Sequence, residues 1–450
     1  MYLLATLLLL AVVGAGPAFR MAIETKLIAA DSAAGDQFSS SVSVSGDIAV
    51  VGAFADDDDG SASGSAYVFG RDEGGPDNWG LVKKLTASDA AAADNFGTSV
   101  SISGDTIVVG ALGDDDNGSA SGSAYVFDRD EGGVSNWGEV KKLTAGDGAA
   151  TDTFGRSVSV SGDTVVVGAN QDDDAGADSG SAYVFGRDQG GLDNWGQVKK
   201  LTADDAASGD KFGVSVSIDM DTVVVGANGD AGRAYVFGRD QDGVGNWGQV
   251  KKLVASDAAG GDQFGLSVAV DGDTALIGSP FDDDAGPISG SAYFFERDQG
   301  GTDNWGELTK VTAVDAAAFD GFGTSVGLSG NAAVIGAFRD DDGFDRAGSS
   351  YVYRPSVSGT TWNHQTKLHA SDAGLNDEFG TTVALSGATV VVGALQIAVG
   401  AAPGKAYAYE LIAASVPVSS PSVIGLLGGL LALTGAALAL RTLRPGSSET

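Results

Sequence analysis

Residues 151–205 read TDTFGRSVSVSGDTVVVGANQDDDAGADSGSAYVFGRDQGGLDNWGQVKKLTADD, and nearly everything between residues 24 and 411 repeats this unit with small changes. A fixed period of this size is typical of a solenoid, a propeller or a tandem array. Seven copies start near a phenylalanine, at spacings of 58, 58, 58, 52, 58 and 57 residues: Phe38, Phe96, Phe154, Phe212, Phe264, Phe322 and Phe379.

Each copy contains four runs with strand character, separated by Gly- and Asp-rich turns. In the third copy, residues 154–161 alternate Val and Ser, and residues 164–169 form a continuous β-branched run. Two shorter runs follow at 182–185 and 195–203. Four short antiparallel strands per period predict a propeller blade, whereas one coil of a β-helix needs less than half this length.

The count of strands predicts how the ring closes. The first three runs occur seven times, but the fourth occurs six times and is absent after Tyr407. Residues 24–31 (ETKLIAAD) resemble the missing run, which reads KKLTASD elsewhere. We therefore expect an all-β, closed seven-bladed propeller of four-stranded antiparallel blades, in which an N-terminal strand completes the last blade.

The composition excludes several classes of function. Lys and Arg number 26 against 60 Asp and Glu, for a formal net charge of −34. Such a surface repels nucleic acid and anionic lipid, and it favours cations and basic partners. The chain has no Cys, so it has neither disulfides nor thiolate chemistry.

The two ends predict export and anchoring. Residues 1–18 have the short apolar run and small residues of a signal peptide. After the repeat domain at 19–411, a Pro/Ser spacer (412–422) leads to an uncharged apolar stretch (423–440) and a basic tail (441–450). That stretch is long enough for a transmembrane helix, and the tail would stay cytoplasmic. It also resembles bacterial sorting signals that are removed by exosortase-type enzymes, so retention of the helix stays open.

The repeated Phe-Gly pairs and the following Val-Gly-Ala, or Gly278-Ser279-Pro280, resemble the FG-GAP repeat family. That family includes the seven-bladed propeller of integrin α subunits and many bacterial surface proteins. The resemblance implies the propeller fold and a role in binding. Copy one departs from it with Phe38-Ser39. The integrin calcium cage between the first two strands has no counterpart, because residues 103–106 form only a short turn.

Carboxylates concentrate in two other connections. One is the loop between the second and third strands, which carries runs of Asp in every copy except four and seven. The other is the connection between blades, which carries pairs of Asp five residues apart: 31/36, 89/94, 147/152, 205/210, 257/262, 315/320 and 372/377. Because antiparallel strands alternate in direction, both connections are expected on one face of the ring, called here the acidic face.

Two interpretations of this face stay open. Asp and Gly are good turn formers, and their charge gives solubility. Alternatively, clustered carboxylates suit Ca²⁺. The candidate metal ligands are Asp56, Asp57, Asp58, Asp114, Asp115, Asp116, Asn117, Asp172, Asp173, Asp174, Asp282, Asp283, Asp284, Asp340, Asp341 and Asp342.

Other recurring residues have structural explanations. Lys pairs such as Lys83-Lys84 fit an exposed sheet edge, where they block aggregation. Adjacent Arg-Asp pairs such as Arg71-Asp72 fit turn ion pairs, and the six Trp fit packing at the blade margin. The two histidines, His364 and His369, are expected at the surface and outside any catalytic arrangement.

The favoured function is therefore a non-catalytic, surface-exposed binding or adhesion propeller with no catalytic or cofactor-binding residues. Its expected partners are an extracellular protein or glycan and, through the C-terminal helix, a membrane; nucleic acid is excluded and the propeller is expected to be monomeric. The expected location is the cell surface or outer envelope. The alternatives are a structural envelope protein and a carboxylate-based polysaccharide hydrolase or lyase. Near-identical blades disfavour an enzyme, since catalysis needs one asymmetric site.

Overall fold

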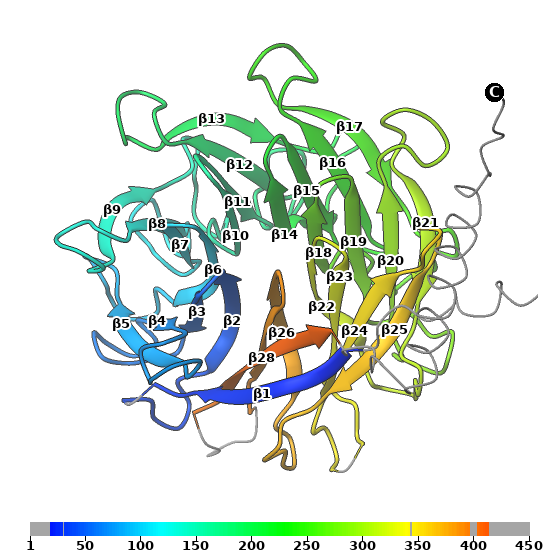
Figure 1. Ribbon diagram of the computed structural model, residues 1–450. Coiled ribbons are helices and arrows are strands. Elements are labelled where there is room, and N and C mark those ends of the chain that lie inside the picture. Colours follow the sequence, from blue (N-terminus) through cyan, green and yellow to red (C-terminus); the bar gives the residue numbers. More distant parts are fainter. Residues whose placement is uncertain (1–18, 30, 343, 397–402, 414–450) are drawn as a thin grey trace, which may run out of the picture. The chain divides into compact units, whose positions relative to one another are not determined.

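A computed structural model describes residues 19–29, 31–342, 344–396 and 403–413 of the chain. The chain divides into two units, of which residues 21–411 form the one that holds the repeats. In this unit the described strands form seven four-stranded antiparallel sheets around a common axis (Figure 1). The predicted all-β, seven-bladed propeller is confirmed.

Each blade has the same order of strands from the axis outward. The innermost strands are β2 (Phe38–Ser45), β6 (Phe96–Ser103), β10 (Ser157–Ser161), β14 (Phe212–Asp219), β18 (Ser267–Asp271), β22 (Phe322–Ser329) and β26 (Phe379–Ser386). The second strands are β3 (Ile48–Ala53), β7 (Thr106–Ala111), β11 (Thr164–Ala169), β15 (Thr222–Ala227), β19 (Thr274–Ser279), β23 (Ala332–Ala337) and β27 (Thr389–Ala394).

The outer half of each blade completes the sheet. The third strands are β4 (Ser65–Gly70), β8 (Ser123–Asp128), β12 (Ser181–Gly186), β16 (Arg233–Gly238), β20 (Ser291–Glu296), β24 (Ser349–Pro355) and β28 (Lys405–Ala413). The outermost strands are β5 (Gly80–Leu85), β9 (Gly138–Leu143), β13 (Gly196–Leu201), β17 (Gly248–Leu253), β21 (Gly306–Val311), β25 (Trp362–Leu368) and β1 (Phe19–Leu27).

The ring closes as the strand count predicts. The last blade has the order β1-β28-β27-β26, so its outermost strand comes from the start of the chain (Figure 1). Leu27 is 1% exposed in this position. The strand runs from Phe19 to Leu27, so it starts before the predicted 24–31 and also ends before it.

The predicted signal peptide, spacer, membrane helix and tail lie outside the described residues, apart from the start of the spacer at 412–413. Across the described part of the chain, none of the secondary structure is a helix with the length and apolar character that a bilayer span requires.

The alternation of Val and Ser in the innermost strands has two physical causes. The valines pack between neighbouring blades, and Val100 is 6% exposed. The serines accept hydrogen bonds from backbone N–H groups of the next blade. Ser41 and Ser43 accept from the N–H groups of Val100 (2.9 Å) and Ile102 (3.1 Å). The series continues to the last blade, where Ser386 accepts from the N–H of Gly46 at 3.2 Å. The innermost strands are thus joined around the axis without forming one continuous sheet.

The Phe-Gly and Val-Gly-Ala motifs bring neighbouring blades into close contact. Phe96 is fully buried, and its ring lies edge-on to Tyr125. The next residue, Gly97, has φ +93°, and a Cβ there would lie 2.2 Å from the carbonyl oxygen of Ser65. A Cβ on Gly52 of the preceding blade would lie 2.1 Å from the carbonyl oxygen of Gly97. Both glycines are therefore needed where one backbone touches another.

Candidate functional site

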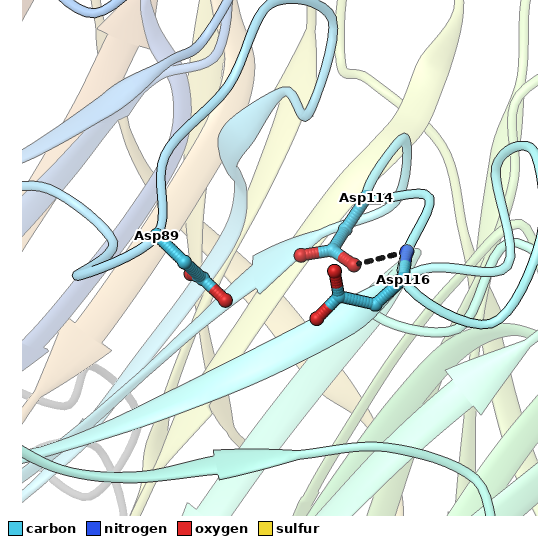
Figure 2. A group of neighbouring side chains, drawn as sticks. All are labelled: Asp89, Asp114 and Asp116. Carbon is cyan, nitrogen blue, oxygen red and sulfur yellow. Dashed lines mark hydrogen bonds between the residues drawn. The ribbon is translucent and has the colours of Figure 1, made fainter.

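Blade two shows the carboxylate cluster of the acidic face clearly (Figure 2). Asp89 comes from the connection that enters the blade, and Asp114 and Asp116 come from the loop between β7 and β8. One oxygen from each carboxylate lies within 4.8 Å of the others. The two acidic connections therefore meet on one face, as the alternation of strand direction predicts.

The ammonium of Lys142 lies among these carboxylates. Its Nζ is 2.7 Å from Oδ2 of Asp89, 2.8 Å from Oδ2 of Asp114 and 2.5 Å from Oδ2 of Asp116. The Tyr125 hydroxyl donates hydrogen bonds to Asp114 (2.7 Å) and Asp89 (2.9 Å), and its ring centre lies 5.3 Å from Nζ. Tyr125 and Lys142 face each other in the β8–β9 register, so strand pairing places both groups.

The loop that supplies two of the carboxylates is held by its own hydrogen bonds. The N–H of Asp116 donates to Oδ1 of Asp114 at 3.2 Å, a bond drawn in Figure 2. The N–H of Gly122 closes the loop on the carbonyl of Asp114 at 2.9 Å. The Asp114 side chain is only 4% exposed, whereas that of Asp116 is 61% exposed. The cluster thus has a buried inner side and a solvated rim.

The surroundings of the cluster shift the pKa values of Lys142, Asp89 and Tyr125 away from neutrality. Burial lowers the pKa of Lys142, but hydrogen bonds from its ammonium to Asp114, Asp116 and Asp89 more than offset this and hold the pKa above its usual range. Burial raises the pKa of Asp89, yet the hydrogen bonds from Lys142 and Tyr125 bring it below its usual range. Burial and the neighbouring Asp114 raise the pKa of Tyr125. At neutral pH, Lys142 is therefore a cation, Asp89 an anion and Tyr125 a neutral donor.

The same arrangement recurs wherever a blade has the Asp triplet. Each lysine contacts the connection Asp together with the first and third Asp of its triplet: Lys84 with Asp31, Asp56 and Asp58; Lys200 with Asp147, Asp172 and Asp174; Lys310 with Asp257, Asp282 and Asp284; Lys367 with Asp315, Asp340 and Asp342.

The two blades without a triplet differ. In blade four, Lys252 pairs with Asp205 at 2.6 Å. In blade seven, Lys26 and Lys405 both contact Asp372, at 2.7 and 3.3 Å. The lysine is therefore present in every blade, and the number of carboxylates around it varies.

The structure separates the predicted metal ligands into two groups. The first and third Asp of each triplet point to the lysine. The middle residues are exposed and make no contact with the lysine: Asp57, Asp115, Asp173, Asp283 and Asp341. Asn117 is also exposed, and its N–H donates to Ser121.

Three members of the cluster were not among the predicted site residues: the connection Asp, the Tyr and the Lys. A signal for the lysine exists in the spacing, because Lys84 and Lys142 each follow the first Asp of their triplet by 28 residues. The connection Asp also recurs in every copy. Neither signal says that the three groups meet, since this depends on the fold of the loop.

The cluster offers the ligand chemistry of a calcium site, but the lysine takes its centre. Three carboxylates suit Ca²⁺ in charge and atom type, and Ca²⁺ takes six to eight oxygens at about 2.3–2.6 Å. Here the oxygens lie at hydrogen-bonding distance from Nζ. A calcium ion would have to displace the lysine side chain, so the residues as placed do not fit it.

The prediction that the lysines serve as exposed edge residues is wrong for the second Lys of each pair. Lys142 has a side chain only 20% exposed, because it turns toward the carboxylates. The first Lys of each pair contacts the next blade: Lys83 donates to Asn136 at 3.1 Å, and Lys141 donates to Asn194 at 3.2 Å.

The adjacent Arg-Asp pairs have different partners from those predicted. Arg129 pairs with Asp105, in the turn between the first two strands, at 2.8 Å. Its guanidinium lies 5.1 Å from the ring centre of Trp137, which is 2% exposed. The prediction that the tryptophans pack in the blade is confirmed.

One of the two histidines departs from the expected surface position. His369 is exposed as predicted. His364 is half-buried, with its ring 5.7 Å from that of Tyr353 and its pKa lowered by burial.

Comparisons with known proteins identify the repeat. Among solved structures, the chain is similar to Sqt1 of Saccharomyces cerevisiae, with 12% identity, a TM-score of 0.44, and coverage of 84% of this chain and 83% of that one. The curated proteins gave no match. The FG-GAP repeat model matches seven segments, which together make up more than half of the chain: residues 22–69, 79–127, 137–185, 195–237, 247–295, 305–353 and 362–409. The chain therefore belongs to the FG-GAP repeat family.

Proposed function

We propose that this protein is a non-catalytic ligand-binding propeller of the adhesion type, which contacts its ligand through the loops of the acidic face. One observation carries the proposal. In five blades the recurring carboxylates are bound to a lysine and a tyrosine of their own blade, which leaves the outer side of the loops to meet a ligand. Binding proteins commonly place variable loops on a rigid scaffold in this way.

The ion pairs also disfavour the alternative of a carboxylate-based hydrolase. A general acid needs a carboxyl group that can release and regain a proton near the working pH. The lysine holds the pKa of Asp89 below its usual range, and the same holds for Asp147, Asp257 and Asp315. These four groups are fixed as anions, which suits a structural role better than proton transfer. Asp320, whose pKa is raised to about 6, is only 3% exposed and is therefore shielded from a substrate.

We further propose that the protein is exported and displayed at the cell surface or outer envelope. Support comes from the sequence alone: the apolar start at 1–18, the uncharged stretch 423–440 and the basic tail that follows it. Fractionation of producing cells, with protease added from outside, tests this. Display predicts that the propeller is accessible and remains with the membrane fraction.

Calcium binding, one of the two interpretations of the acidic face, would require the ion to displace the ammonium of a lysine. From this geometry we expect the melting temperature of the full chain to be the same with EDTA and with millimolar Ca²⁺. A fall of several degrees in EDTA would instead support a resident calcium ion.

A direct test of the proposed function uses cells that display the full chain. They are exposed to arrays of glycans and extracellular matrix proteins, and cells without the chain serve as the control. We expect retention on a restricted set of ligands. Release of shortened chains from a polysaccharide would support the enzyme alternative. Absence of both binding and cleavage would support the structural alternative.

A further inference from the structure

Blade six departs from the repeat at three positions that meet on the acidic face. Phe319 stands where blade two has Ala93. Arg339 and Arg346 stand where blade one has Ala55 and Ala62. In near-identical blades, a site that is present once has to be built from residues that the other blades lack. The two arginines and the phenylalanine therefore make blade six the candidate for such a site.

The three side chains line a cavity of about 370 Å³ on the acidic face. It lies between the connection that enters blade six and the loop that joins β23 to β24. Phe319 is 54% exposed, so its ring is accessible. The volume falls in the range of small-molecule sites, roughly 300–1,000 Å³. The complete lining is Ala318, Phe319, Arg339, Asp341, Asp345 and Arg346.

The two arginines are not equivalent. Arg346 pairs with Glu378, which is fully buried in the neighbouring connection. Arg339 lies 4.7 Å from the ring centre of Phe338 and, among the described residues, has no ion pair. The Nε atoms of both arginines are buried and have no hydrogen-bond partner within the described part of the chain. Arg339 interacts with Glu378 only at longer range, so its guanidinium is available to an external anion.

The rest of the cavity restricts which anion fits. Asp341 and Asp345 line the same space and are exposed. They repel a polyanion, but they accept hydrogen bonds from hydroxyl groups. The open ring of Phe319 offers an apolar surface to the C–H face of a sugar. A ligand with one carboxylate, several hydroxyls and a ring satisfies all three features.

We propose that this cavity binds a terminal acidic sugar of a glycan, with its carboxylate on Arg339 and Arg346, its hydroxyls on Asp341 and Asp345, and its ring against Phe319. The proposal rests on the proposed binding function and specifies its ligand. A peptide with one carboxylate could satisfy the arginines and donate its N–H groups to the aspartates, but a sugar also presents a rigid C–H face to the ring of Phe319.

The test compares methyl glucuronide, which has the carboxylate, with methyl glucoside, which lacks it, in saturation-transfer NMR on the full chain. A short peptide with a single Asp is the third probe. We expect methyl glucuronide to bind at least about tenfold more tightly than the other two, because hydrogen bonds to a charged group contribute about 1.5–3 kcal/mol.

Two variants restore residues that other blades already have, so the fold should tolerate them. Arg339→Ala should weaken glucuronide binding at least about tenfold, and Phe319→Ala should weaken it less. The double variant Arg346→Ala/Glu378→Asn, which restores the Ala62 and Asn95 of blades one and two, avoids leaving Glu378 buried alone. Val134→Ala in blade two is the control, because Val134 is 92% exposed in the connection between β8 and β9, on the face opposite to the cavity; it should leave glucuronide binding unchanged.

Equal binding of the two sugars, absence of glucuronide binding, or full binding by Arg339→Ala would overturn the assignment. Preference for the Asp peptide would show that the ligand is a protein. The array experiment separates this from the wider proposal: if cells with the full chain are retained on the arrays while methyl glucuronide does not bind, the adhesion function stands and the sugar site does not.

Discussion

Lys142 shows how one side chain decides the chemistry of a whole loop. Three carboxylates close together repel one another strongly at short range. The ammonium, at 2.5–2.8 Å from all three, offsets this repulsion and allows Asp114 to be almost fully buried. The lysine therefore does for the loop what a metal ion does in other acidic loops.

Replacement of this lysine tests its structural role. Lys142→Met should destabilise the protein by about 2 kcal/mol, because it leaves the buried Asp114 without a cation; the value is below that for fully buried pairs because one side of the cluster is solvated. Urea unfolding measures the change. Lys252→Met in blade four is the matched control. Its partner Asp205 has a side chain 47% exposed, so the loss should stay within about 1 kcal/mol. Equal losses would contradict the role of the triplet.

Gly97 and Ser39 occupy the same position in successive copies, and they should respond in opposite directions. Gly97→Ala places a Cβ 2.2 Å from the Ser65 carbonyl at φ +93°, so we expect a loss of at least about 2 kcal/mol. Ser39 has φ 74°, and its buried hydroxyl has no partner among the described residues. Ser39→Gly should therefore be neutral or stabilising by up to about 1 kcal/mol. A marked loss of stability in Ser39→Gly, seen as a lower urea midpoint, would show that the hydroxyl is needed.

At the scale of elements, the strands were predictable and the loop contacts were not. Residues 164–169 were predicted as a strand, and β11 has these bounds with every residue buried. Residues 154–161 were predicted as one strand, whereas β10 starts at Ser157 and Phe154 forms only an isolated bridge with Gly122. Periodicity reports which face of a strand is buried. It does not report how a loop of consecutive Asp folds, and for this reason the lysine and tyrosine partners were missed.

The connections between blades predict an unusual dependence of stability on pH. Burial, together with the nearby Asp340 and Asp341, raises the pKa of Asp320 to about 6, and burial raises that of Asp94 in the same position. A raised pKa in the folded state means that the charged form is destabilising. Stability should therefore increase as the pH falls from 7 to about 5 and these groups bind protons.

The first carboxylate of each connection, such as Asp89, has the opposite effect at lower pH. The lysines lower the pKa of Asp89 and of its counterparts. Their contribution is complete above the unfolded value of 3.8 and is lost as the pH falls below it. Melting temperatures from pH 3 to 8 should thus show a maximum near pH 5. Asp320→Asn should reduce the increase between pH 7 and 5; an unchanged profile would contradict the assignment.

At the scale of the whole molecule, seven nearly identical sheets form a scaffold that differs locally. The closed ring was predictable because the strand count left one orphan strand at residues 24–31. The departures of blade six at Phe319, Arg339 and Arg346 are visible in the sequence, but only the structure brings them to one cavity. The effect of a substitution in one repeat therefore depends on the residues that the fold places beside it.

Deletion of residues 19–29 tests the closure of the ring. The deletion removes β1 and exposes the edge of β28 and the apolar surface that covers Leu27. We expect a loss of at least about 3 kcal/mol, from the burial of Leu27 and the lost strand pairing. A synthetic peptide of residues 19–29 should restore part of it. Thermal unfolding that is the same as for the intact chain would contradict the role of this strand.

The pairing of β1 with β28 also sets the order of events during biosynthesis. The ribosome makes β1 first, but its partner emerges only after all the other described strands have been made. A nascent chain therefore cannot close its ring early, however quickly single blades form. Under the export proposed above, this strand order would delay closure of the ring until the whole repeat domain has been made.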